Sequence, residues 1–64
     1  MIIQFPDNRE ENVEAGGKTI ETILIDLGVN PVEMLISRDD EIIPEDTIPA
    51  ETDTIRLIRI AHGG

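Results

Sequence analysis

The sequence has few groups that could carry out chemistry, and the most distinctive one is at its C-terminus. The chain contains no Cys and a single His, His62, which is followed by Gly63 and Gly64. Without a thiol, and without a Ser, His and acidic set, we predict no nucleophilic active site and expect that the protein is not an enzyme. A lone His near a chain end is usually a polar surface residue. The sequence ends in Gly63 and Gly64, and because glycine has no Cβ, the backbone of this pair can take conformations that are closed to other residues.

The acidic residues do not have the spacing of a metal site. They gather at residues 39–41 and 45–46, but a calcium loop requires twelve residues with ligands at fixed positions and a central Gly. One His and no Cys also exclude the usual zinc ligand sets. We therefore expect no metal and no cofactor bound to the chain itself.

The composition limits the classes of molecule that the protein can bind. A formal net charge of −9 on 64 residues disfavours nucleic acid and anionic membranes and favours a basic partner surface. Phe5 is the only aromatic residue, so a base-stacking surface is absent. No apolar run approaches the roughly 20 residues that span a bilayer, and Met1 is not followed by a signal-peptide pattern. We expect a cytoplasmic monomer with a core built largely from its twelve isoleucines.

The hydrophobic pattern begins with a hairpin. Residues 1–5 are rich in strand formers, with Met1, Ile3 and Phe5 on one face, and turn-forming residues follow at 6–8. Residues 10–15 can return as a second strand with Val13 inward, although acidic residues are poor strand formers.

One helix follows the hairpin. After a Gly-Gly break at residues 16–17, apolar residues recur at i, i+3, i+4 and i+7, which is the spacing of one helical face. Thr19 is a suitable N-cap and Gly28 a suitable C′ residue, and Pro31 prevents continuation. The predicted apolar face consists of Ile20, Ile23, Leu24 and Leu27.

Three more strands are predicted at residues 32–38, 41–43 and 54–60, with a turn at Asp39-Asp40 and a loop at 45–53 that holds at most one helical turn. In the first, Val32, Met34 and Ile36 share the inner face, and Leu35 and Ser37 share the wet face. In the last, Ile55 and Leu57 point inward. The order predicts an α+β fold with a mixed sheet of four to five strands and one crossing helix.

This order resembles the β-grasp, ubiquitin-like superfamily, and within it the sulfur carriers ThiS and MoaD and the small archaeal modifier proteins. The similarity covers the whole chain and is clearest at residues 39–46 and 55–64, which end in Gly63-Gly64. One departure is Asp39-Asp40, where the family often has Asn-Gly or Asp-Gly, and this leaves the tightness of the turn open. The resemblance implies a β-grasp domain at residues 1–61 and a flexible tail at 62–64.

The resemblance also implies a chemistry for Gly64. In the first interpretation, an ATP-dependent activating enzyme adenylates its carboxylate, which is converted to a thiocarboxylate that donates sulfur to thiamine, molybdopterin or tRNA thiolation. In the second, Gly64 forms isopeptide bonds with target lysines. Lys18 is the only lysine, so self-linked chains would use Lys18 or the Met1 amine. A third interpretation is an inert binding or structural domain.

A partner-binding patch is expected beside the tail. If the strands at 32–38 and 54–60 are neighbours, as the family fold implies, apolar side chains from both would be exposed together, and such clusters usually mark interaction sites. The predicted patch consists of Leu35, Ile58 and Ile60, bordered by Arg56 and Arg59.

Overall fold

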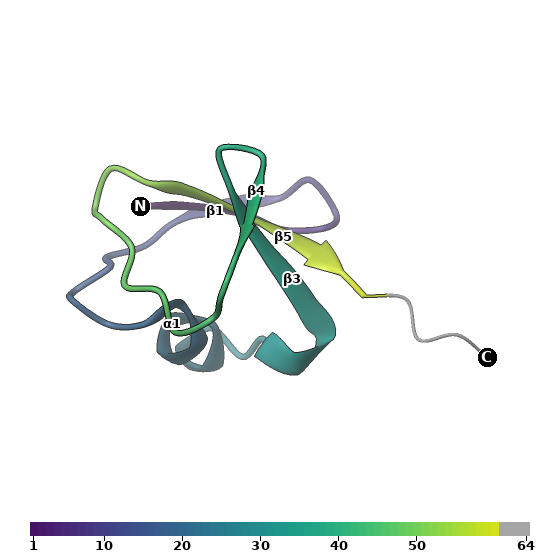
Figure 1. The fold of residues 1–64 in the computed structure, drawn as a ribbon, viewed down its shortest axis with the longest axis horizontal. Helices are drawn as coiled ribbons and strands as arrows, with labels where there is room; N and C mark the ends of the chain where they lie inside the picture. Colours follow the sequence, from purple (N-terminus) through teal and green to yellow (C-terminus); the bar gives the residue numbers. More distant parts are fainter. Residues whose placement is uncertain (61–64) are drawn as a thin grey trace.

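The computed structural model describes residues 1–60, in which a five-stranded mixed sheet is covered on one face by a single helix (Figure 1). This confirms the predicted α+β, β-grasp architecture. The predicted tail at residues 62–64 lies outside the described residues. The elements are β1 (Ile2–Gln4), β2 (Glu10–Asn12), α1 (Ile20–Asp26), the 3₁₀ helix η1 (Pro31–Glu33), β3 (Met34–Arg38), β4 (Glu41–Ile43) and β5 (Thr54–Arg59). In the same described part, no helix is long and apolar enough to cross a membrane.

The last strand lies in the middle of the sheet. The strand order is β2-β1-β5-β3-β4, with β5 parallel to β1 and antiparallel to β3. A parallel pair cannot be joined by a tight turn, so the chain crosses from one side of the sheet to the other through α1 before β5 is added. As a result, the chain leaves the fold from a central strand that has a neighbour on each side.

Helix α1 has the ends that the sequence predicted. The Thr19 hydroxyl accepts the backbone N–H of Thr22 at 3.2 Å, and Gly28 at the other end has φ +78°. The Gly28 N–H donates to the Ile25 carbonyl and the Val29 N–H to the Leu24 carbonyl, which is the Schellman pattern. Seven residues are too few for a stable isolated helix, so the helix depends on its packing against the sheet.

The core lies between α1 and the facing side of the sheet. The inward residues predicted for the first and last strands are buried, and Ile3, Ile55 and Leu57 are almost completely so. Of the predicted helix stripe, Leu27 is only partly buried. The full set of buried apolar residues is Met1, Ile3, Phe5, Ala15, Ile20, Ile23, Leu24, Ile36, Ile55 and Leu57.

Two strand predictions were too long. Residues 13–15 do not continue β2, although the Val13 N–H still donates to the Met1 carbonyl at 2.9 Å and Val13 packs on the core. Val32, predicted to point inward from a strand, is 71% exposed in η1. The reason is that the Asn30 side chain accepts the Val32 N–H while Pro31 provides a preset φ, and together these start a helical turn.

The turn at Asp39-Asp40 is tight despite its lack of glycine. Arg38 and Glu41 are register partners, so only two residues connect β3 to β4. Asp39 and Asp40 have φ values of 53° and 65°, as in a type I′ hairpin turn, and Asp tolerates this region better than most residues. The following loop to β5 contains turns and no helical turn.

Candidate functional site

The site begins where β5 ends. The Ile60 N–H donates to the Glu33 carbonyl at 2.9 Å, so η1 holds the chain in place for one residue beyond the strand. The residues after this point therefore start from a fixed position at one end of the sheet. Gly63 and Gly64, the predicted reactive pair, lie outside the described residues.

An apolar pair occupies the uncovered face of the sheet at this end. Leu35 and Ile58 are cross-strand register partners, and they are 42% and 39% exposed. Their side chains point away from α1, because Ile36 and Leu57 beside them point into the core. Ile60, the third apolar member of the predicted patch, is partly buried. The structure thus brings Leu35 and Ile58 together as the sequence predicted.

A single row of side chains crosses the same face next to this pair. Arg56 is the register partner of Gln4 on one side and of Ser37 on the other, and Ser37 in turn pairs with Ile42. Ser37 was predicted to be wet but is 7% exposed, since its short side chain lies between two long ones. Ile42 is 58% exposed and extends the apolar surface. Alternation along the strand at 41–43 could have placed Ile42 on the outer face, but the sequence does not reveal that Ile42 pairs with Ser37.

Arg59 lies on the opposite face, and its predicted place beside Ile58 is wrong. Its register partner is Met34, which shares the helix side of β3 with Ile36. Because side chains alternate along a strand, Arg56 and Arg59, three residues apart, must point to opposite faces. The patch on the outer face therefore has one arginine, and the helix side of β5 has the other.

The two amines predicted as self-conjugation sites differ in accessibility. The Met1 amine donates to the Val13 carbonyl at 2.9 Å, and Met1 is buried. Lys18 has an exposed side chain that reaches Asp26 with an Nζ–Oδ2 distance of 3.1 Å, and exposed ion pairs of this kind are weak. Of the two, Lys18 presents the more available nitrogen.

Two acidic side chains have structural roles near the other end of β5. The Glu51 carboxylate accepts the N–H groups of Ala15 and Gly16 at 2.8 and 3.0 Å, and these bonds lower the pKa of Glu51. The backbone N–H of Ala50, and then Arg38, lower the pKa of Asp53 in the same way. Glu51 thus joins the loop before β5 to the loop before α1, and Asp53 joins its loop to Arg38 at the end of β3.

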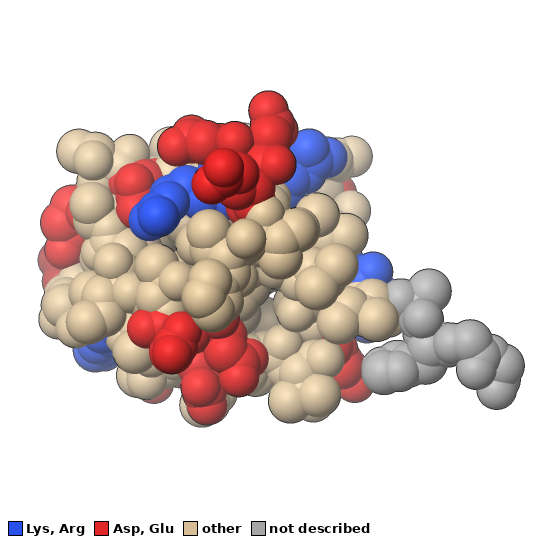
Figure 2. All heavy atoms as spheres, in the orientation of Figure 1, with Lys and Arg blue, Asp and Glu red and all other residues tan. Residues whose placement is uncertain are grey.

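Charge is unevenly spread over the surface. Figure 2 shows acidic side chains in groups above and below a band of uncharged surface. Such a band is where a partner can approach without meeting the strong negative potential of the chain.

Comparison with known families decides the identity of this fold. The sequence model of the ThiS family matches residues 2–64, nearly the whole chain and including the Gly-Gly pair. The protein belongs to the ThiS family. It is also 33% identical over 58 residues to an uncharacterised protein of Archaeoglobus fulgidus, covering 91% of this chain and 85% of that protein. ThiS-family proteins are in general small ubiquitin-like sulfur carriers.

Proposed function

We propose that this ThiS-family protein is a sulfur carrier whose Gly64 carboxylate is adenylated by an ATP-dependent activating enzyme and then converted to a thiocarboxylate. The observation that carries the proposal is the family match, which extends through Gly63 and Gly64. The thiocarboxylate would serve thiamine, molybdopterin or tRNA thiolation, and the receiving synthase would be its second partner.

The reaction begins with a poor acyl donor. A Gly64 carboxylate oxygen attacks the α-phosphorus of ATP and releases pyrophosphate, which leaves an acyl-adenylate. Hydrosulfide then attacks the carbonyl carbon and AMP departs with its electron pair. The product keeps one oxygen and gains one sulfur, and no redox step is required.

The geometry of the carrier supports this role. The segment from residue 61 to Gly64 can extend at most about 14 Å, which is enough to enter a channel in an enzyme only if the enzyme docks close to the end of β5. Leu35 and Ile58 are the exposed apolar pair at that end, and they provide a docking surface there. Docking by the domain and chemistry at Gly64 are therefore separate functions of neighbouring residues.

Adenylation can be tested by ATP–pyrophosphate exchange with the cognate adenylating enzyme. We expect exchange with the 64-residue chain, and none with a variant that has one alanine added after Gly64, because the added residue displaces the reactive carboxylate. Equal exchange with both chains, or with neither, would refute the proposal.

Protein modification uses the same adenylate, with an amine in place of sulfur as the nucleophile. The exposed Lys18 makes self-linked chains through this residue the form to look for. Conjugates in cells that disappear when Gly63 and Gly64 are deleted would assign this activity, and those that also disappear in a Lys18→Arg variant would be the self-linked chains. A thiocarboxylate without conjugates leaves the sulfur-carrier role alone.

A further inference from the structure

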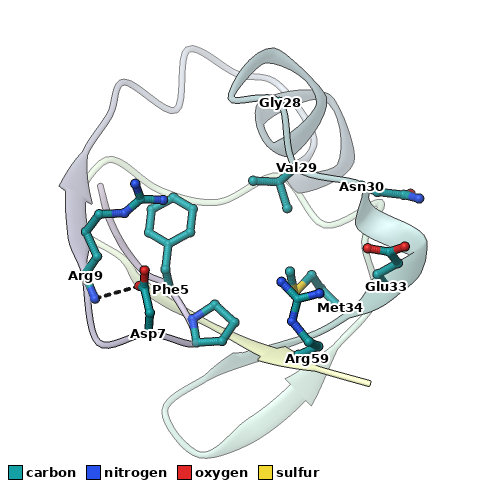
Figure 3. A pocket seen from close by; sticks show the side chains of 10 residues that line it. Phe5, Asp7, Arg9, Gly28, Val29, Asn30, Glu33, Met34 and Arg59 are labelled. Atoms are coloured by element: carbon teal, nitrogen blue, oxygen red, sulfur yellow. Dashed lines mark hydrogen bonds between the residues drawn. The ribbon is translucent and has the colours of Figure 1, made fainter. Parts of the chain in front are cut away.

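A groove lies on the helix side of the sheet, directly behind the Leu35–Ile58 pair. It has a volume of about 440 Å³, and Figure 3 shows side chains from the β1–β2 turn, the end of α1, η1, β3 and β5 pointing around one open space. No part of the described chain fills it. The groove is separate from the outer-face patch, yet it is formed at the same end of β5.

The floor of the groove is apolar and held in place by the core. Phe5 is a buried core residue, and Val29 and Met34 are partly buried and pack against the same core. Val29 is positioned by its N–H bond to the Leu24 carbonyl at the end of α1. This surface is therefore preformed, and an apolar side chain can enter it without reorganisation of the fold.

The rim carries two arginines that form no ion pair within residues 1–60. The ion pairs in this part of the chain use Lys18 and Arg38 instead. The guanidinium of Arg9 stacks on Phe5, 4.4 Å from the ring centroid, and Arg59 extends toward the groove beside Met34 (Figure 3). Both cations are thus available to a carboxylate that enters the groove.

Two carboxylates also line the groove, and within residues 1–60 neither forms an ion pair with Arg9 or Arg59. One oxygen of Asp7 accepts the Arg9 backbone N–H at 3.1 Å, and Glu33 lies across the open space from Arg9 (Figure 3). With two cations and two anions, the groove is neutral, so the net charge of −9 resides on the rest of the chain. An acidic segment therefore meets less repulsion here than beside the acidic groups of the surface (Figure 2). A second copy of the chain, with the same charge of −9, is a poor occupant.

We propose that the groove binds a segment of the adenylating enzyme in which a carboxylate lies next to a large apolar side chain. Met34–Arg59 and Leu35–Ile58 are consecutive cross-strand pairs, so they point to opposite faces at the end of β5. An enzyme that admits the residues after β5 into a channel docks at this end of the sheet, where both pairs lie within its reach. This inference rests on the proposed function and replaces the expected basic partner surface with an acidic, apolar one at this contact.

Charge reversal in the groove tests the proposal. Binding of the cognate adenylating enzyme is measured by calorimetry for the wild type, Arg59→Glu, Arg9→Glu and Lys18→Glu. Each variant changes the formal charge equally, but Lys18 lies outside the groove and forms only an exposed ion pair. We expect the two groove variants to bind about tenfold more weakly, and Lys18→Glu to remain within about twofold of the wild type. Unfolding midpoints confirm that all variants are folded.

The outcomes separate this inference from the function on which it rests. If adenylation proceeds and both groove variants bind like Lys18→Glu, the groove proposal is overturned and the carrier function stands. If the wild type neither binds nor is adenylated, both fail. Amide spectra of the free protein with and without residues 61–64 provide a further check, since shifts at Phe5 and Val29 on truncation would mean that the chain's own C-terminal segment occupies the groove, which also overturns the proposal.

Discussion

Neighbouring residues of β5 provide the sharpest test of the docking surface. Ile58 is 39% exposed on the uncovered face, whereas Leu57 is 1% exposed in the core. The same change, to Glu, at these two positions should therefore have different consequences. We expect Ile58→Glu to impair binding to the adenylating enzyme while the domain stays folded, and Leu57→Glu to unfold it.

The magnitudes follow from the exposed fractions. Burying a whole Ile side chain is worth about 1.5–3 kcal/mol, so the 39% of Ile58 that is exposed can contribute roughly 0.6–1.2 kcal/mol to a complex. A carboxylate that faces Leu35 in the complex adds a desolvation cost of about 2 kcal/mol. The sum, about 3 kcal/mol, corresponds to roughly 100-fold weaker binding.

Ile58→Glu should lower the stability of the fold less than Leu57→Glu does. The covered part of its side chain contributes about 0.9–1.8 kcal/mol, so we expect the unfolding midpoint to fall by roughly 4–14 °C. Leu57→Glu loses its full burial and also places a carboxylate in the core, a cost comparable with the roughly 5 kcal/mol that a small domain has in total.

Calorimetry of binding and thermal circular dichroism measure the two effects. Ile58→Ala serves as an intermediate, with a loss of about three- to eightfold because only the apolar contact is removed. The reasoning is refuted if Ile58→Glu is unfolded at 25 °C, which would make Ile58 a core residue, or if it is folded and binds as tightly as the wild type.

Three further predictions concern stability. Glu51→Gln should lower the urea midpoint at pH 7, because an amide offers one acceptor oxygen where Glu51 uses two. Since the pKa of Glu51 is lowered in the folded state, the wild type is more stable than the variant above the ordinary pKa of 4.5, and this difference disappears as the pH falls through the folded pKa. Equal urea midpoints at pH 7 would contradict the prediction. Asp40→Gly should raise the thermal midpoint by roughly 4–8 °C, since glycine removes about 1 kcal/mol of left-handed strain from the type I′ turn; a fall would show that Asp40 contributes through its side chain. Gly28→Ala should lower it by a similar amount through φ +78° alone, because no atom lies within 4 Å of the added Cβ, and an unchanged midpoint would exclude this strain.

The sequence predicted those parts of the fold that depend on local periodicity. Ile20, Ile23 and Leu24 repeat at helical spacing, and Ile55 and Leu57 alternate in a strand, so α1 and β5 were recognisable. The family resemblance then supplied the neighbouring strands that brought Leu35 next to Ile58.

The parts that were missed depend on local competition or on distant neighbours. The 3₁₀ turn at Val32 forms because the Asn30 side chain competes for a backbone N–H, and the burial of Ser37 depends on side chains from two other strands. The error at Arg59 is of another kind. Side chains alternate along a strand, so Arg59, two residues after the inward-pointing Leu57, could have been placed on the helix side from the sequence alone. The groove could not be read from the sequence, since Phe5, Val29 and their neighbours come from segments far apart in the chain.

The central claim is that Gly64 carries sulfur, and intact mass spectrometry tests it most directly. The 64-residue chain is incubated with its cognate adenylating enzyme, ATP and a sulfide source, with a Gly64-deleted chain as the control. We predict a gain of about 16 Da, from one carboxylate oxygen replaced by sulfur, in the full chain only. An unchanged mass under conditions in which the enzyme consumes ATP, or the same gain in the deleted chain, would contradict the claim.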